Sequence, residues 1–262
     1  MLLFDGMSDI GLERDRQEDV IYQYTYDADT RLFIICDGSG GLVEQIDPAE
    51  IACTEISSFL KRQFEYDKDL FIEHIEHYLT EAFISANRVL GTFRVVNEEK
   101  FSGFGCSVTA CLIYGNRLSF AHCGNTRLHL IKLNKNNRLT INQLTVDHTA
   151  GYEKLLKHQI TEEQYLKGLD KMQLTSGLGV FSEPEIQVST NKFQEGNIII
   201  MTTDGIHYPL YQNSLLELAV RADNTQSTCK ALIEAAKMQK YPDNMSAMVI
   251  FSVSDDPIVT EK

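Results

Sequence analysis

The sequence predicts an α+β fold in which antiparallel sheets pack together and helices lie outside them. Runs rich in β-branched and aromatic residues occur near both ends of the chain, and two helical segments separate the first runs from a long central block of strands. This order lacks the strict alternation of strand and helix that is typical of parallel α/β folds. A layered α+β arrangement is therefore expected.

Eight segments have the length and composition of β-strands. They are residues 20–26, 31–37, 106–114, 117–123, 127–133, 138–145, 197–203 and 245–253. Residues 114–117, Tyr-Gly-Asn-Arg, predict a tight hairpin turn because Gly and Asn tolerate positive φ. A second turn is expected at 132–138, so the central strands should pair with antiparallel neighbours.

Apolar residues recur at helical spacing between these strands. Asp47 followed by Pro48 marks the start of one helix, because Pro is favoured in a first helical turn. A second pattern runs from Asp69 to Leu90 over about five turns. Two more helices are expected near 213–221 and 225–239. The polar, helix-prone segment 148–170 lacks strong periodicity and is predicted to form a flap.

Length and charge limit the classes of protein to which the chain can belong. It has 262 residues, 37 of them acidic and 24 basic, and a formal net charge of −13. No linker rich in Pro, Gly or Ser divides it, so we expect one domain over residues 1–254 and a short C-terminal tail over 255–262. The acidic balance argues against nucleic acid and anionic membranes as partners, since both require a basic surface.

The cysteines and the N-terminus indicate the compartment. Six cysteines lie mostly in apolar runs and form no C-x-x-C pair, which is typical of reduced core thiols. The first residues contain charges and lack the apolar run of a signal peptide. No run of about 18 apolar residues could span a membrane. We therefore expect a cytoplasmic protein, and a single acidic domain of this size is expected to be a monomer.

Three aspartates adjoin apolar strands and are candidate metal ligands. Asp37 and Asp204 each follow such a strand and precede a glycine, and Asp243 comes shortly before the last strand. A carboxylate beside a glycine can offer oxygen ligands, with a backbone carbonyl, to a shared cation. Carboxylates in one space repel each other unless cations lie between them, and oxygen ligands favour Mg²⁺ or Mn²⁺ over zinc. The alternative is that each Asp-Gly pair is a turn.

A second polar cluster precedes the strand at 20–26. Arg14 could bind a phosphate through its planar guanidinium group, while Glu18 and Asp19 could hold metal-bound water. The alternative interpretation is a solvated polar turn. His122 lies within an apolar strand and is expected to be a core residue with hydrogen-bond partners, not a ligand.

These pieces, in their order along the chain, resemble the metal-dependent PPM/PP2C-type protein serine/threonine phosphatases in their short bacterial form. Residues 11–19 are similar to the opening "G…R…NED" of that family, and 37–41 to its "DGHGG" or "DGMGG". Further along, 103–110, 122–127 and 144–148 resemble "GTT" or "GST", "VGDSR" and "LTxDH". The segments 174–179, 203–205 and 243–244 resemble "LTRALG", "SDG" and the closing "DN". The resemblance covers residues 11 to 250.

The resemblance implies a four-layer α/β/β/α sandwich of two antiparallel sheets flanked by helices, with a two-metal site at one end. Asp37 would bridge the two Mn²⁺ or Mg²⁺ ions, and Gly38 would lend its carbonyl oxygen. Asp204 and Asp243 would complete the shell of one ion. The other metal ligands, direct or through water, would be Glu18 and Asp19.

The resemblance also implies an activity. The chain would hydrolyse phosphoserine and phosphothreonine by direct attack of a water that bridges the two metals, without a phosphoenzyme. The catalytic residues would be Arg14, Asp37 and Asp204, with Arg14 holding the phosphate. The expected partner is a phosphorylated protein, either a Ser/Thr kinase or its targets.

One departure from the family pattern bears on activity. Asn125 stands where the family has an Asp that helps to hold a third metal ion, so third-site binding is expected to be weak or absent. The alternative function is a catalytically weak or inactive PP2C-like module that binds phosphoproteins. Since Asp37, Asp204 and Asp243 are all present, an active enzyme is the favoured interpretation.

Overall fold

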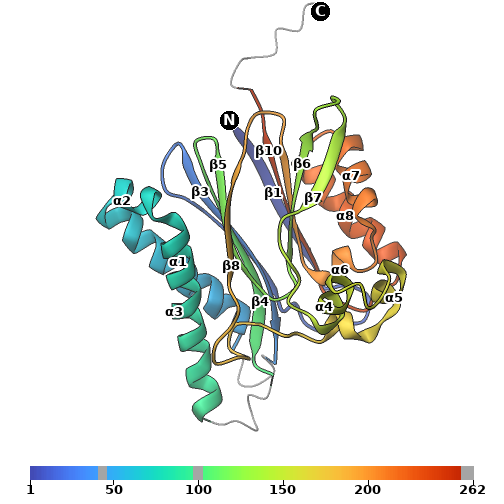
Figure 1. Cartoon of the computed structure of the whole chain (residues 1–262), viewed down its shortest axis with the longest axis horizontal. Coiled ribbons are helices and arrows are strands. Elements are labelled where there is room, and N and C mark those ends of the chain that lie inside the picture. The colour runs from blue at the N-terminus through green and yellow to red at the C-terminus, as the bar shows by residue number, and fades with distance from the viewer. Residues whose placement is uncertain (41–45, 97–102, 255–262) are drawn as a thin grey trace, which may run out of the picture.

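Two antiparallel sheets of five strands face each other, and helices cover both outer faces (Figure 1). The computed structural model describes residues 1–40, 46–96 and 103–254. The predicted tail 255–262 and Gly41 of the predicted glycine motif lie outside the described residues. The α+β sandwich that the sequence predicts is confirmed.

The first sheet has the strand order β1-β10-β9-β6-β7, with every neighbouring pair antiparallel. Its strands are β1 (Leu2–Asp9), β10 (Met245–Ser252), β9 (Ile198–Thr202), β6 (Arg127–Leu133) and β7 (Leu139–Gln143). The second sheet has the order β2-β3-β4-β5-β8 and is also antiparallel throughout. Its strands are β2 (Asp19–Thr25), β3 (Thr30–Ser39), β4 (Gly105–Tyr114), β5 (Arg117–Cys123) and β8 (Gln187–Lys192).

All eight predicted strands are confirmed, and the structure adds β1 and β8. Both additional strands lie at an edge of their sheet. β8 has the sequence QVSTNK, and none of its side chains is fully buried. β1 contains two aspartates and a glycine among its eight residues. Neither strand shows the apolar pattern from which a strand is predicted, because an edge strand is only partly covered.

Three helices cover the second sheet: α1 (Pro48–Tyr66), α2 (Lys68–Glu73) and α3 (Ile75–Val96). The predicted cap at the start of α1 is confirmed, since the Asp47 carboxylate accepts the backbone N–H groups of Ala49 and Glu50. The helix predicted from Asp69 onward is interrupted at His74, whose backbone leaves the helical region with φ −111° and ψ 30°.

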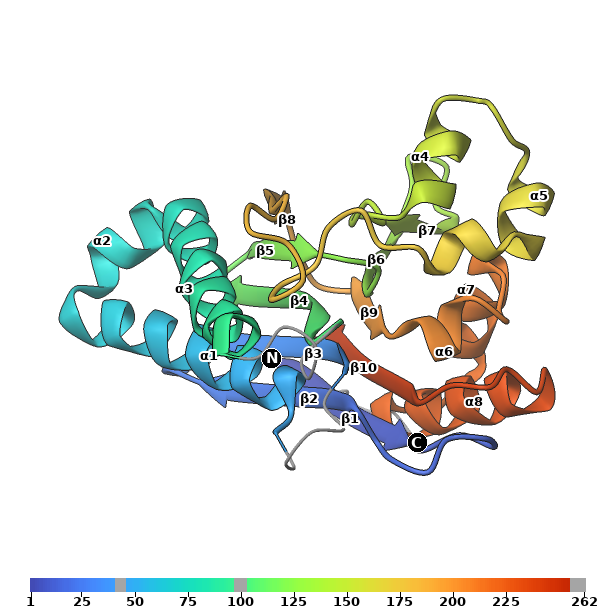
Figure 2. The ribbon, with the colours of Figure 1, turned by 90° about the horizontal axis from the view of Figure 1, so that it is seen from below.

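The other sheet is covered by α6 (Asp204–His207), α7 (Gln212–Arg221) and α8 (Thr225–Met238). Between β7 and β8 the chain forms α4 (Ala150–Leu156), α5 (Glu162–Lys167) and the short 3₁₀ helix η1 (Leu169–Met172). A backbone bridge between Thr149 and Leu174 closes this excursion. The segment 148–173, which contains the flap predicted at 148–170, is called the flap below. Figure 2 shows it on the side of the molecule away from α1 and α3.

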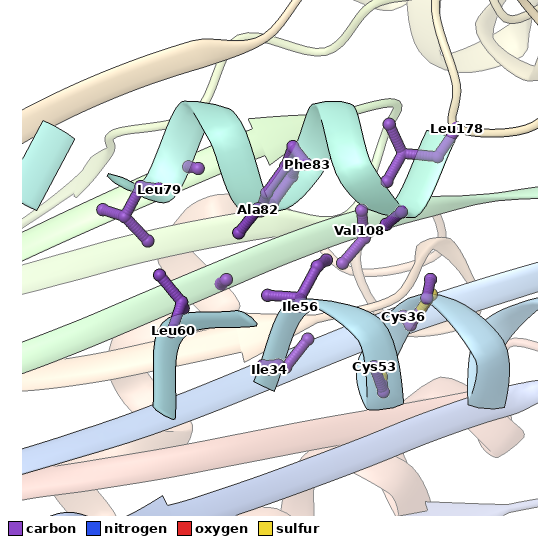
Figure 3. Packing of buried hydrophobic residues seen from close by; sticks show 14 of the residues in the cluster. Ile34, Cys36, Cys53, Ile56, Leu60, Leu79, Ala82, Phe83, Val108 and Leu178 are labelled. Atoms are coloured by element: carbon purple, nitrogen blue, oxygen red, sulfur yellow. The ribbon is translucent and has the colours of Figure 1, made fainter. Parts of the chain in front are cut away.

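Buried apolar side chains fill each of the three spaces between neighbouring sheets and helix layers, and each such set is here called an apolar layer. The largest layer lies between α1, α3 and the second sheet, and it contains Ile34, Ile56, Leu60 and Phe83 (Figure 3). A second fills the space between the sheets, and a third packs beneath α6, α7 and α8. All six cysteines are free and buried, which confirms the prediction of reduced core thiols. Within the described residues, no helix combines the length and apolar character needed to cross a membrane.

Phe83 gives a direct test of the core beneath α3. Its ring is fully buried, so Phe83→Ala leaves a cavity and should lower the free energy of unfolding by about 3–5 kcal/mol. Tyr66→Ala is the matched control, because that ring is 85% exposed at the end of α1 and its loss should change stability by no more than about 0.5 kcal/mol. Urea unfolding of both variants measures the difference, and equal unfolding midpoints would contradict this description of the core.

Candidate active site

Acidic residues from both sheets converge at one end of the sandwich. In the second sheet, Asp19 at the start of β2 lies directly opposite Asp37 of β3. In the first sheet, Asp204 follows β9 and Asp243 precedes β10. Because β9 and β10 are antiparallel neighbours, the end of one and the start of the other lie at the same edge. The topology thus brings together four of the predicted site residues.

The Asp-Gly pairs are not loop turns. Asp37 and Gly38 both belong to β3, which continues to Ser39, and Asp204 and Gly205 begin α6. A Cβ atom on Gly38 would lie 2.8 Å from the backbone oxygen of Glu18, and one on Gly205 would lie 1.9 Å from that of Asn244. Glycine is therefore required because another backbone passes close to it, and the turn interpretation is wrong for both pairs.

Polar side chains join the two sheets beneath the acidic cluster. The Thr203 hydroxyl donates to Asp19 Oδ2 over 2.9 Å and accepts the backbone N–H of Ser246 over 3.0 Å. The Asn244 side chain accepts the N–H of Glu18 and donates to the carbonyl oxygens of Ile10 and Arg16. Neither role was predicted, although both residues adjoin predicted ligands. These bonds hold the N-terminal segment that carries Arg14 and Glu18 against the start of β10.

Burial and mutual repulsion oppose ionisation of the clustered carboxyl groups. Burial, followed by repulsion from Asp204, Asp19 and Asp243, raises the pKa of Asp37 well above its ordinary value. Burial raises the pKa of Asp204 to about 8, with further repulsion from Asp243 and Asp19. Burial also raises the pKa of Asp19 to about 7, although the Ser246 and Thr203 contacts lower it. Positive charge placed among these groups would relieve the repulsion.

Arg14 lies at the outer rim of the cluster. Its guanidinium group forms a 2.9 Å ion pair with Asp243, and the Arg14 side chain is 44% exposed. Burial raises the pKa of Glu18, while the nearby Arg14 charge acts in the opposite direction. Arg14 and Asp243 therefore neutralise each other's charge. A phosphate would compete with Asp243 for the Arg14 guanidinium group, and a cation would compete with Arg14 for the Asp243 carboxylate.

The donor set fits hard divalent cations. The candidate ligands supply only oxygen atoms, which Mg²⁺ and Mn²⁺ prefer. Asp204 Oδ1 is buried and has no hydrogen-bond partner among the described residues, so it is free to accept a cation. Across the ranges 1–40, 46–96 and 103–254, no three His, Cys, Asp or Glu side chains already form a metal-binding group.

Asn125 and Tyr208 lie beside Asp204 and are linked to it by hydrogen bonds. The Asn125 side-chain amide donates to Asp204 Oδ2 and to the Tyr208 hydroxyl, each over 3.2 Å. Nothing in the sequence around Tyr208 pointed to a site residue.

His122 is fully buried, with Nδ1 bonded to the Thr109 hydroxyl and Nε2 to the Val146 carbonyl. The prediction that His122 is a partnered core residue is confirmed.

Comparison with known proteins agrees with this fold. A putative protein phosphatase 2C-type protein of Streptococcus pyogenes is 23% identical over 95% of this chain and 97% of its own length. The serine/threonine protein phosphatase PstP of Mycobacterium tuberculosis is 26% identical over 98% of this chain, which matches 46% of PstP. The crystal structure of the PstP catalytic domain with two manganese ions superposes with a TM-score of 0.78 at 23% identity, over 97% of this chain and 99% of that one.

The family model of protein phosphatase 2C matches residues 11–154, more than half of the chain. This segment contains Arg14, Glu18, Asp19, Asp37 and Gly38, while Asp204 and Asp243 reach the same cluster through the fold. The chain belongs to the protein phosphatase 2C family of protein serine/threonine phosphatases.

Proposed function

We propose that this chain hydrolyses phosphoserine and phosphothreonine in proteins with the aid of two divalent cations, Mn²⁺ or Mg²⁺. The observation that carries the proposal is the meeting of Asp37 and Asp204, from different sheets, with pKa values raised by burial and repulsion. Perturbed carboxylates that converge in this way are typical of functional sites. The two manganese ions of PstP, which has the same fold, support this choice of cofactor.

The proposed cation ligands are those that the family resemblance implied. Asp37 would bridge the ions with help from the Gly38 carbonyl, Asp204 and Asp243 would complete one shell, and Glu18 and Asp19 would bind directly or through water. Two cations in such a site lower the pKa of a shared water and neutralise charge that develops on the phosphoryl oxygens. With Asn125 as a neutral amide beside Asp204, a third cation is expected to bind weakly or not at all.

The protein's own contribution is positioning. The Thr203 hydroxyl holds the Asp19 side chain, and the Asn244 side chain holds the Glu18 backbone, so both predicted ligands of the second sheet are tied to segments of the first sheet. Arg14 stands exposed at the rim, where its guanidinium can exchange Asp243 for the two oxygens of a phosphate. That exchange would also release Asp243 for a cation, so that phosphate and cation assist each other's binding.

The substrate and the domain follow from the same proposal. The expected substrate is a phosphorylated protein, either a Ser/Thr kinase or one of its targets, because relatives across the full length carry protein phosphatase names. Residues 1–254 would act as one phosphatase domain and as a monomer. Support for a single domain comes from the three apolar layers, of which one lies between the two sheets and the other two lie on their outer faces.

Asp204→Asn should abolish turnover while the fold survives. Loss of a residue that supports a metal ligand already costs about 10–100-fold, so loss of the ligand itself should exceed about 100-fold. Asp27→Asn is the matched control, since Asp27 pairs with Lys68 and belongs to no proposed ligand set. Hydrolysis of a phosphothreonine peptide and of p-nitrophenyl phosphate, with circular dichroism of each variant, measures the effect. Unchanged turnover by Asp204→Asn would overturn the assignment.

Metal titration tests the cofactor separately from turnover. Calorimetry with Mn²⁺ should detect two sites in the metal-free protein, and Asp37→Asn should remove both, because Asp37 is the proposed bridging ligand. EDTA should abolish hydrolysis, and added Mn²⁺ should restore it. A folded protein that binds no Mn²⁺ but retains a phosphopeptide would instead favour a binding module without catalysis.

A further inference from the structure

The Asp204 carboxylate is connected to the flap through two buried side chains. One end of the connection is the pair of 3.2 Å hydrogen bonds that Asn125 donates to Asp204 Oδ2 and to the Tyr208 hydroxyl. At the other end, the Tyr208 hydroxyl donates to the backbone carbonyl of Lys171 in η1 over 2.5 Å. Asn125 is 5% exposed and Tyr208 6%, so solvent has little access to these bonds.

The direction of each hydrogen bond is fixed by chemistry. An amide nitrogen can only donate, a carbonyl oxygen can only accept, and a tyrosine hydroxyl has a single proton. The Tyr208 hydroxyl must therefore accept from Asn125 and donate to Lys171. If the flap moves away, the Tyr208 hydroxyl proton loses the Lys171 carbonyl as its acceptor. The hydroxyl must then stay unpaired or turn to another acceptor, and either change disturbs the Asn125 amide that donates to Asp204.

A second group of polar contacts, here called the second anchor, holds the flap against the same end of the first sheet. Arg127 forms a two-point ion pair with Asp147, with N–O distances of 2.6–3.1 Å. The hydroxyl of Tyr165, in α5, donates to Asp147 over 2.9 Å and accepts from Arg127 over 3.1 Å. The Arg127 guanidinium also lies 5.6 Å from the centre of the Tyr208 ring. Arg127 pairs with Thr202 at the end of β9, so both anchors attach the flap to the strand end that carries Asp204.

We propose that Tyr208 and Asn125 are positioning residues that couple the place of the flap to the orientation of the Asp204 carboxylate. Asn125, which also donates to the Tyr208 hydroxyl, holds Asp204 Oδ2, and the buried Oδ1 is the atom left for a cation. The inference rests on the proposed function in one respect, because it takes Asp204 as a cation ligand. Coupling between two sites is reciprocal, so a cation that fixes Asp204 should also stabilise the closed flap.

Hydrogen exchange of the flap amides, with and without Mn²⁺, tests the coupling without a measurement of turnover. The test variant is Tyr208→Phe, which removes only the linking hydroxyl. The matched control is Tyr152→Phe, because Tyr152 lies in α4 of the same flap and its hydroxyl has no hydrogen bond to the described residues. Calorimetry of each protein establishes the Mn²⁺ concentration that saturates it.

Saturating Mn²⁺ should slow flap exchange by about fivefold or more in the wild type and in Tyr152→Phe. In Tyr208→Phe with Mn²⁺ bound, the change should fall below about twofold, which is well under the roughly fivefold lower end of typical allosteric coupling. The coupling would be overturned if bound Mn²⁺ did not change flap exchange in the wild type. It would also be overturned if Mn²⁺ slowed flap exchange in Tyr208→Phe as much as in the wild type.

A wild-type protein that binds no Mn²⁺ would overturn the two-cation proposal, and the coupling would then be decided in the metal-free protein. The side-chain hydrogen bonds of Asn125 go to Asp204 and Tyr208, and neither residue belongs to the flap. Asn125→Ala should nevertheless speed flap exchange at least about twofold if the connection couples Asp204 to the flap. An unchanged exchange rate would refute the inference.

Discussion

Repulsion among buried carboxylates is the constraint on which the rest of this site depends. Asp19, Asp37 and Asp204 are held close together by strands of two sheets, and burial alone already raises the pKa of each. Such a cluster lowers the stability of the fold unless cations or hydrogen-bond donors compensate it. The surrounding structure supplies neutral donors, such as Thr203, and leaves the buried Asp204 Oδ1 without a hydrogen-bond partner among the described residues. This combination is typical of a site built for cations rather than for stability.

The sandwich explains why such a cluster can be assembled at all. Asp19 and Asp37 are fixed by the register of β2 and β3, while Asp204 and the segment before β10 are fixed by the pairing of β9 with β10. The spacing between the two pairs is then set by the packing of the apolar layer between the sheets. Close backbone approaches at Gly38 and Gly205 hold neighbouring segments together within each of the two pairs. The chemistry therefore depends on core packing at some distance from the reacting atoms.

The sequence predicted the features that arise from local patterns. Central strands are apolar along their length, and Asp47 with Pro48 marks a helix start, so these elements could be identified from composition. The edge strand β8 could not, since it takes its structure from pairing with β5 and not from its own polar sequence. The contacts of Asn125 with Asp204 and Tyr208 join residues 79 and 83 positions apart. No local pattern encodes such contacts, and only the folded chain reveals them.

Asn125 illustrates how the structure changes an interpretation based on sequence. As a departure from the family pattern it suggested weak binding of a third metal ion and supported the alternative of a weak or inactive module, because an amide binds a cation less well than a carboxylate does. In the folded chain its amide donates to Asp204, and this hydrogen bond lowers the pKa of that carboxyl against the effects of burial and repulsion. A second carboxylate at this place would act in the opposite direction and add to the repulsion. The amide thus favours the ionised form of Asp204, which is the form that binds a cation.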